Sequence, residues 1–434
     1  MVENEEKIRL LPPLSISTLL KRNINKMNKL LSVFFLFCMM LLTDCQTDNG
    51  NKSTANKQEY AKGTFGYDLI FLKKHHKNLV VLGDDSSGAQ VILLPNYQAR
   101  VMTSSAKGYE GISFGWINHD LITSGKYNAH INAFGGEERF WVGPEGGQFS
   151  VFFQKGSTFD LTHWQTPAII DTVSFELVEK QANKAIFTKD FEIENYSGTK
   201  FNVSLNREIS LLNQSQAEEQ LKVSLKEVHW VGYQTVNELK NIGSSDWDKS
   251  KGVLSIWLLG MMNASPKNTI IVPFQKGQSD KINDAYFGKI GGDRLIKNDS
   301  VLFFKADAQS RGKIGIPPQA LKPIAGSYDA EHQILTILQF DYKGETDYVN
   351  SMWEIQKFPY KGDVLNAYND GKNDTGTQLG QFYELESSSP AIALKRNETL
   401  RHTQRTFHFE GSESQLDTLC KQLLGVGLKD LPKF

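Results

Sequence analysis

Acidic, imidazole and amide side chains gather near the end of the chain, between residues 382 and 410. Glu384 and Glu386 alternate with apolar residues, which predicts a strand with both carboxylates on one face. A Ser-Pro break follows, because proline has no backbone donor for a sheet. We then expect a short strand over 391–394 and a longer one over 400–409. The longer strand carries four polar side chains on one face: His402, Gln404, Thr406 and His408.

Carboxylates and imidazoles on neighbouring strands of an apolar sheet are suited to moving protons. A reaction with two proton transfers needs a base that takes one proton and an acid that gives another. Glu386 is the predicted base, since it precedes the Ser-Pro break at a strand end, and Glu384 is the alternative. His402 and His408 are the candidate partners because imidazole titrates near neutral pH. Either could instead be a hydrogen-bonded histidine of the sheet.

A second group of functional side chains lies in the glycine-rich segment 130–147, which begins with His130. Arg139 offers a planar fork of donors for sugar hydroxyls or a carboxylate. Trp141 offers a flat face on which a pyranose ring can pack. Paired glycines let the backbone approach a ligand or bend a sheet. We therefore count His130, Arg139 and Trp141 as ligand contacts, with a structural glycine-rich turn as the alternative.

The order of features after residue 382 resembles the C-terminal part of the galactose mutarotase-like (aldose 1-epimerase) superfamily. Relatives there have an acidic strand, Ser-Pro, an apolar strand, a Pro-Gly-Glu turn and a strand with Thr and Phe. Here Arg396-Asn397 stand where Pro-Gly is usual. The resemblance implies that the acidic residue is a general base, and that Glu137, Arg139 and Trp141 line the sugar cleft. It is closest to envelope lipoproteins with that fold.

The middle of the chain departs from the pattern of active aldose epimerases. These enzymes carry an Asn-His pair that provides a proton donor, whereas Asn237 stands here without an adjacent His. Asn237 is kept as a candidate sugar contact. Trp353, within 347–356, is a candidate stacking face, although a core strand is the favoured interpretation of that segment.

Glycine content and short alternating segments predict an all-β protein. The chain has 35 Gly and 26 Phe, and turn residues separate the alternating runs. We expect a large antiparallel β-sandwich, of the supersandwich type that the resemblance implies, with a short C-terminal helix around Cys420. Runs 79–82 and 89–94 should pair, the turn 195–198 should close a hairpin, and 220–232 should form a strand.

The start of the chain predicts the cellular location of the protein. Basic residues precede the apolar run 30–42, which is short for a bilayer span and typical of a signal peptide. Leu42 lies three residues before Cys45, as in a lipobox, so we expect a leader over 1–45, acylation of Cys45, a tether over 46–60 and one domain over 61–434. The protein would then be a lipoprotein of the bacterial cell envelope, facing the periplasm or the cell surface. An ordinary secretion signal and an uncleaved anchor are the alternatives, and Met27 is an alternative start.

Charge and motifs exclude several classes of function. The net charge of −1 lacks the excess of positive charge that is typical of a nucleic-acid-binding protein. We expect no cofactor and no metal, with a calcium site in the polar turn 366–374 as the weaker alternative. The sequence therefore predicts a carbohydrate-binding protein, with an aldose epimerase using a Glu base as the enzymatic form. A non-catalytic glycan-binding protein and a lyase or hydrolase accessory on the same scaffold are the alternatives.

Overall fold

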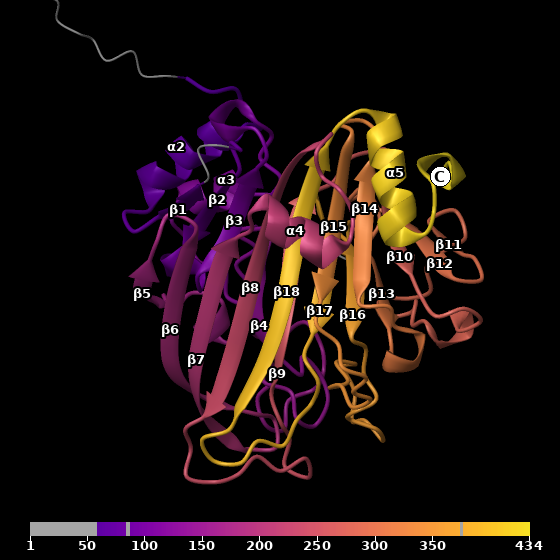
Figure 1. Ribbon diagram of the computed structural model, residues 1–434. Helices are drawn as coiled ribbons and strands as arrows, with labels where there is room; N and C mark the ends of the chain where they lie inside the picture. The colour runs from indigo at the N-terminus through magenta and orange to yellow at the C-terminus, as the bar shows by residue number, and fades with distance from the viewer. Residues whose placement is uncertain (1–58, 84–86, 374–375) are drawn as a thin grey trace, which may run out of the picture. The chain divides into compact units, whose positions relative to one another are not determined.

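Alternating apolar and polar residues build three antiparallel sheets in the computed structural model, which describes residues 59–83, 87–373 and 376–434 (Figure 1). The predicted leader, Cys45 and nearly all of the predicted tether lie outside the described residues. From Glu59 to Phe434 the chain forms one compact unit. Within the described ranges, no helix combines the length and apolarity that a membrane crossing requires.

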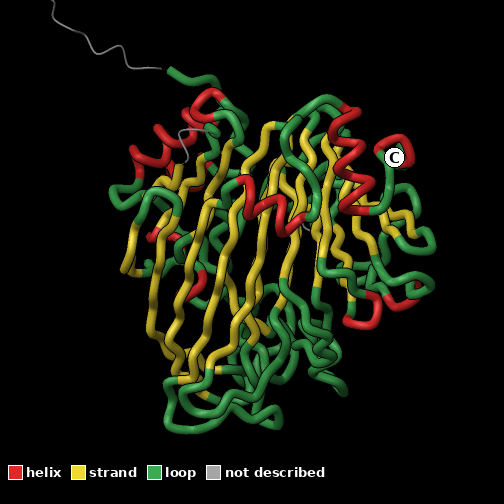
Figure 2. Tube along the Cα trace, in the orientation of Figure 1, coloured by secondary structure: helices red, strands yellow, loops and turns green. Residues whose placement is uncertain are grey.

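The largest sheet has ten strands, and strands dominate the trace in Figure 2. The turn after Glu194 joins β6 (Lys184–Glu194) to β7 (Lys200–Leu211) as predicted, and the side chain of Asn195 accepts a hydrogen bond from the backbone N–H of Thr199 at 2.9 Å. In spatial order the strands are β11 (Leu295–Lys297), β12 (Val301–Lys305), β10 (Asn268–Pro273), β14 (Ile324–Asp329), β15 (Ile334–Phe340), β18 (Thr399–Glu410), β8 (His229–Asn241), β7 (Lys200–Leu211), β6 (Lys184–Glu194) and β5 (Glu176–Lys180).

A five-stranded sheet packs face to face against part of the ten-stranded sheet. Its strands, in spatial order, are β13 (Gly312–Ile316), β16 (Leu365–Asn369), β17 (Phe382–Ser388), β9 (Ser255–Asn263) and β4 (Arg139–Gly143). Buried apolar residues from both sheets form one core, in which Ile270 and Phe304 of the larger sheet join Ile314 and Leu385 of the smaller. Two apolar sheet faces buried against each other are the basis of a β-sandwich.

The third sheet and the helices cover the remaining apolar faces. The sheet consists of β1 (Val80–Gly83), β2 (Gln90–Leu94) and β3 (Arg100–Ser105), and β1 pairs with β2 as predicted. The helices are α2 (Phe65–His75), α3 (His119–Ser124), α4 (Gln214–Leu221) and α5 (Glu413–Leu424). Cys420 of α5 is buried against the ten-stranded sheet. The all-β sandwich with a short C-terminal helix is thus confirmed.

Three expectations about single elements were wrong. Residues 391–394 form no strand, and the segment instead connects β17 in one sheet to β18 in the other. The strand expected over 220–232 begins only at His229, the start of β8. The residues at 220 and 221 instead end α4, which starts at a capping box formed by Asn213 and Gln216. Residues 347–356 form no strand either, so Trp353 lies on a loop rather than in a core strand.

Candidate active site

Alternation along β17 separates two sets of side chains. Tyr383 and Ser387 point to the ten-stranded sheet, where the Tyr383 hydroxyl lies 2.7 Å from Ser327 Oγ and Ser387 Oγ lies 2.7 Å from His402 Nε2. Because successive strand residues point to opposite faces, Glu384 and Glu386 belong to the other face of the five-stranded sheet. The predicted pair of same-face carboxylates is therefore present.

Strand pairing brings the two groups of functional residues together across this outer face. On β4 and β9, Trp141 lies opposite Trp257, and on β9 and β17, Met261 lies opposite Glu384. The guanidinium of Arg139 forms a buried ion pair with Glu384 and lies 4.8 Å from the centre of the Trp141 ring. Residues about 240 positions apart in the chain thus form one cluster.

A cavity of about 250 Å³ lies over this cluster. Loops complete it, and aromatic side chains contribute much of its wall. Besides Arg139, Trp141 and Glu384, its lining includes His130, Glu145, Trp164, Trp257, Phe287, Arg311, Lys313, Trp353 and Tyr368. We call this cavity the cleft. His130 and Trp353, both predicted contacts, therefore line the cleft.

Two carboxyl groups of the cleft have pKa values above their ordinary range. Burial raises the pKa of Glu384 to about 7, against the opposing effect of Arg139. Burial likewise raises the pKa of Glu145 to about 6, although Lys313 opposes the rise. Groups that titrate near neutral pH can give or take protons under ordinary conditions.

Glu386, the predicted base, does not line the cleft. It is fully buried, and its Oε2 accepts hydrogen bonds of 2.9 Å from Lys313 Nζ and from Trp257 Nε1. Burial acts to lower the pKa of Lys313, but the carboxylates of Glu386 and Glu145 outweigh it, so the pKa is raised. Lys313 therefore stays charged and separates Glu386 from the cleft.

His402 and Asn237 also lie outside the cleft, between the sheets. Burial lowers the pKa of His402 to about 4, so its ring is neutral at physiological pH. The Asn237 side chain accepts a hydrogen bond from Arg207. Neither residue lines the cavity that contains Glu384.

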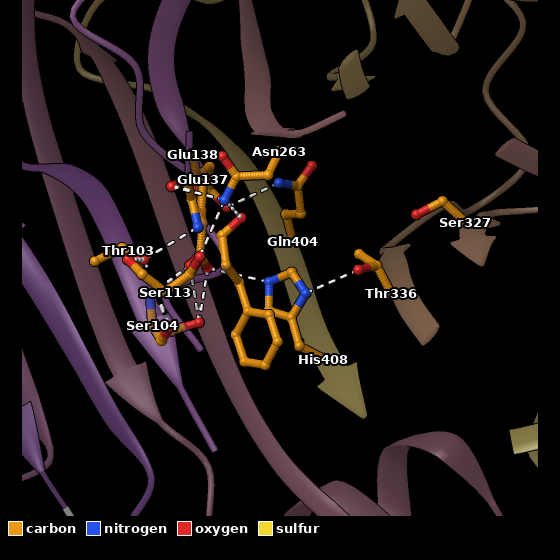
Figure 3. A network of polar contacts seen from close by, with 12 residues as sticks. Thr103, Ser104, Ser113, Glu137, Glu138, Asn263, Ser327, Thr336, Gln404 and His408 are labelled. Carbon is orange, nitrogen blue, oxygen red and sulfur yellow. Dashed lines mark hydrogen bonds and ion pairs between the residues drawn. The ribbon is translucent and has the colours of Figure 1, made fainter. Parts of the chain in front are cut away.

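Glu137 and His408 belong to a buried polar network on the inner side of the sandwich (Figure 3). His408 Nε2 lies 3.1 Å from Glu137 Oε2, and His408 Nδ1 lies 2.8 Å from Thr336 Oγ1. Ser104 donates its hydroxyl to Glu137 at 2.8–2.9 Å. These two predicted residues therefore meet each other, but not Arg139 or Trp141.

Comparison with known protein families places the chain. Residues 63–434 match the model described as "Family of unknown function (DUF6786)". The chain belongs to this family. A search of curated proteins finds no match.

A search of solved structures finds several that are similar to this DUF6786 protein at low identity. A Synechocystis protein is 12% identical with a TM-score of 0.46, over 77% of this chain and 96% of that one. A galactose mutarotase-like protein from Lactobacillus casei is 9% identical with a TM-score of 0.43, over 76% and 100%. A galactose mutarotase related enzyme from Lactobacillus acidophilus is 8% identical with a TM-score of 0.42, over 76% and 97%.

Several cleft residues of this DUF6786 protein were not predicted. Glu145 follows Gly143-Pro144 in the glycine-rich segment already singled out, so its place in that segment was the available signal. Trp257 and Lys313 gave no local signal, because each reads as an ordinary residue of an apolar strand. Only the pairing of β9 with β4, and of β13 with β16, shows that they face the cleft.

Proposed function

We propose that the cleft binds a sugar and that Glu384 acts as the base in an aldose 1-epimerase-type ring opening. The observation that carries the proposal is the position of Glu384, whose pKa is about 7, in one cavity with Arg139 and Trp141. At pH 7 about half of such a carboxyl population is ionised and can accept a proton.

The reaction requires two proton transfers and one broken bond. Glu384 takes the proton of the anomeric hydroxyl, and the bond between the anomeric carbon and the ring oxygen breaks. The ring oxygen takes a proton from Glu145, the second cleft carboxyl with a raised pKa. Rotation of the open-chain aldehyde and reversal of both transfers give the other anomer. Arg139 stays beside Glu384 and orients it.

Binding in the cleft draws on aromatic surfaces and on buried donors. Trp141, Trp164 and Trp353 supply faces against which the C–H surface of a pyranose can pack. Arg139 Nε, Trp141 Nε1 and Trp164 Nε1 are buried without a hydrogen-bond partner among the described residues. Sugar hydroxyl oxygens would accept from these groups, whereas an apolar ligand would leave them unsatisfied.

Non-catalytic glycan binding is the second candidate, and one observation favours it. Glu386, which was predicted as the base from its position before the Ser-Pro break, forms a hydrogen bond with Lys313 and does not line the cleft. A chain that had exchanged catalysis for binding would have this arrangement. The two candidates differ only in whether Glu384 exchanges protons with the bound sugar.

Anomer exchange of freshly dissolved glucose and galactose, followed by polarimetry or NMR, tests the catalytic form. Glu384→Gln should lower the protein-dependent rate by about 10² or more, the usual contribution of a general base. Glu192→Gln, a change at an exposed strand carboxyl, should leave the rate unchanged. A rate with protein equal to the rate without it would remove this form of the proposal for those sugars.

Ligand-observed NMR with the same sugars tests binding. Trp141→Phe should weaken binding, because it removes the indole N–H and part of the stacking face. Trp247→Phe is the matched control, since Trp247 is also buried with an unpartnered Nε1 but packs on Phe201. Equal loss in both variants would contradict the cleft as the sugar site.

We also propose that a lipid on Cys45 holds this domain at the cell envelope. The proposal rests on the apolar run 30–42 and the Leu-containing motif before Cys45. Its test is given with the predictions below.

A further inference from the structure

A second cavity, of about 470 Å³, lies on the other face of the strands that form the cleft. On β9 and β17, Met261 and Glu384 line the cleft. An adjacent residue on each strand, Met262 and Tyr383 respectively, lines the second cavity. The two cavities share no lining residue. The second cavity therefore needs its own explanation.

The hydrogen-bond network fixes what the inner wall of this cavity can offer (Figure 3). Glu137 accepts from Ser104, and His408 Nε2, which lies 3.1 Å from Glu137 Oε2, is placed to donate to it. In a neutral ring, His408 Nδ1 then accepts the hydroxyl hydrogen of Thr336. The hydrogen of Thr336 is used in this way, and its oxygen can only accept from a ligand.

A second acceptor lies beside Thr336. Asn268 is 2% exposed and lines the cavity, and its Oδ1 has no hydrogen-bond partner among the described residues. A buried carbonyl oxygen without a partner costs about 1–3 kcal/mol. A donor on a bound molecule would remove that cost. Ser327 and Tyr383 share one hydrogen bond of 2.7 Å. The second hydroxyl hydrogen of this pair can be donated to a ligand or to Asn268 and Thr336, which interact with Tyr383.

Charge excludes an anionic ligand from the buried wall. The ionisable side chains His408 and His332, which line the cavity, are each paired with a carboxylate, Glu137 and Asp329 respectively. Lys62 is the lysine of the lining, and it is exposed. A carboxylate or phosphate would bring only acceptors to a wall that already presents acceptors.

We propose that this cavity is a second binding site, for a neutral polyhydroxylated molecule such as a monosaccharide or a polyol. Hydroxyl groups both donate and accept, which matches Asn268 and Thr336 as acceptors and the Ser327–Tyr383 pair as donor. Met262 and Phe114 give the cavity an apolar wall for C–H groups. The volume falls within the range of about 300–1,000 Å³ that small-molecule sites occupy. This site does not depend on the function proposed for the cleft.

Isothermal calorimetry and ligand-observed NMR with glucose and myo-inositol test the site in the Trp141→Ala background, in which the cleft is impaired. Binding should persist there, and glucuronate should bind more weakly than glucose. Thr336→Val, which keeps the side-chain shape and removes the hydroxyl, should weaken glucose or inositol binding about three- to tenfold. Thr188→Val is the matched control, because Thr188 bonds Leu205 on the distant strands β6 and β7 of the same sheet.

Ser327→Ala gives a second variant should Thr336→Val unfold, and thermal melts report folding for each. It should also weaken binding, because it removes the partner of Tyr383. The proposal is overturned if neither neutral probe binds in the Trp141→Ala background. It is also overturned if glucuronate binds as well as glucose, or if folded Thr336→Val and Ser327→Ala bind like the control.

Discussion

Glu384→Gln should remove a pH dependence of folding stability that the buried carboxyl creates. Burial raises the pKa of Glu384 from 4.5 to about 7 in the folded chain, despite its ion pair with Arg139. The folded state therefore holds this proton more tightly than the unfolded state. As pH rises from 4.5 to 7, the unfolded chain releases the proton first, and the free energy of unfolding falls.

The size of the effect follows from the two pKa values. Their difference, at about 1.4 kcal/mol for each pH unit, corresponds to about 3 kcal/mol. The stabilisation relative to Gln is fully present below pH 4.5 and is lost by about pH 7.5. Glu384 is almost completely buried, so solvent screening leaves this figure little reduced.

Urea unfolding of wild type and Glu384→Gln between pH 4.5 and 8 measures the effect directly. The difference between the two free energies of unfolding cancels every other titrating group. It should shift by about 3 kcal/mol in favour of the variant as pH rises. Glu192→Gln, at an exposed carboxyl paired with Lys200, should give a nearly constant difference.

A difference that moves in the opposite direction would refute the reasoning. It would mean that Arg139 stabilises the ionised carboxylate more than burial opposes it, so that the pKa of Glu384 lies below 4.5. Glu384 would then be a permanently ionised partner of Arg139. A base with a pKa near 7 would have to be sought elsewhere in the cleft.

Three further predictions concern Lys313, Glu145 and Cys45. Lys313→Met leaves the carboxylate of Glu386 buried without its cation, so chemical denaturation at pH 7 should show that the free energy of unfolding falls by about 3–5 kcal/mol. Adding Glu386→Gln should recover most of this loss. No recovery would contradict the ion pair between Lys313 and Glu386. In the proposed reaction Glu145 must be protonated and Glu384 ionised, so the anomer-exchange rate should peak between about pH 6 and 7 and fall as pH rises further, and a flat profile through pH 8 would exclude Glu145 as the acid. Cys45→Ser should move the protein from the detergent-extracted membrane fraction to the soluble fraction. Mass spectrometry of the N-terminal peptide should then no longer detect the added mass of a lipid. An unchanged distribution between the two fractions would contradict acylation.

Local alternation predicted single strands well. The runs around Glu384 and His402 became β17 and β18 with the expected faces, because a residue's side of a strand depends only on its position. The β6–β7 hairpin could be predicted equally well, since its turn residues act locally. The pairing of strands that are distant in sequence could not be predicted in this way. β17 and β18 were expected to be neighbours in one sheet, but the connection after Ser388 carries the chain into the opposite sheet.

That change of sheet explains why the predicted site divided into two. With β17 and β18 in one sheet, Glu384, His402 and His408 could have shared a surface. With the strands in facing sheets, the carboxylates of β17 point outward, while the imidazoles of β18 point into the space between the sheets. His402 meets Ser387 there, on the inner face of β17. The imidazole of the cleft is instead His130, from a loop in the first third of the chain.

The choice between Glu384 and Glu386 shows where pattern reasoning ends. The two residues have the same parity, the same strand and the same side-chain type, so periodicity cannot rank them. What separates them is Lys313, which comes from β13, two strands away across the sheet. Its ammonium bonds Glu386 at 2.9 Å, while Arg139 from the opposite edge strand bonds Glu384. The carboxyl that lines the cleft, Glu384 or Glu386, therefore depends on the cations that the two edge strands bring to them. Those cations are set by the order of strands in the sheet and cannot be read from the sequence of β17 alone.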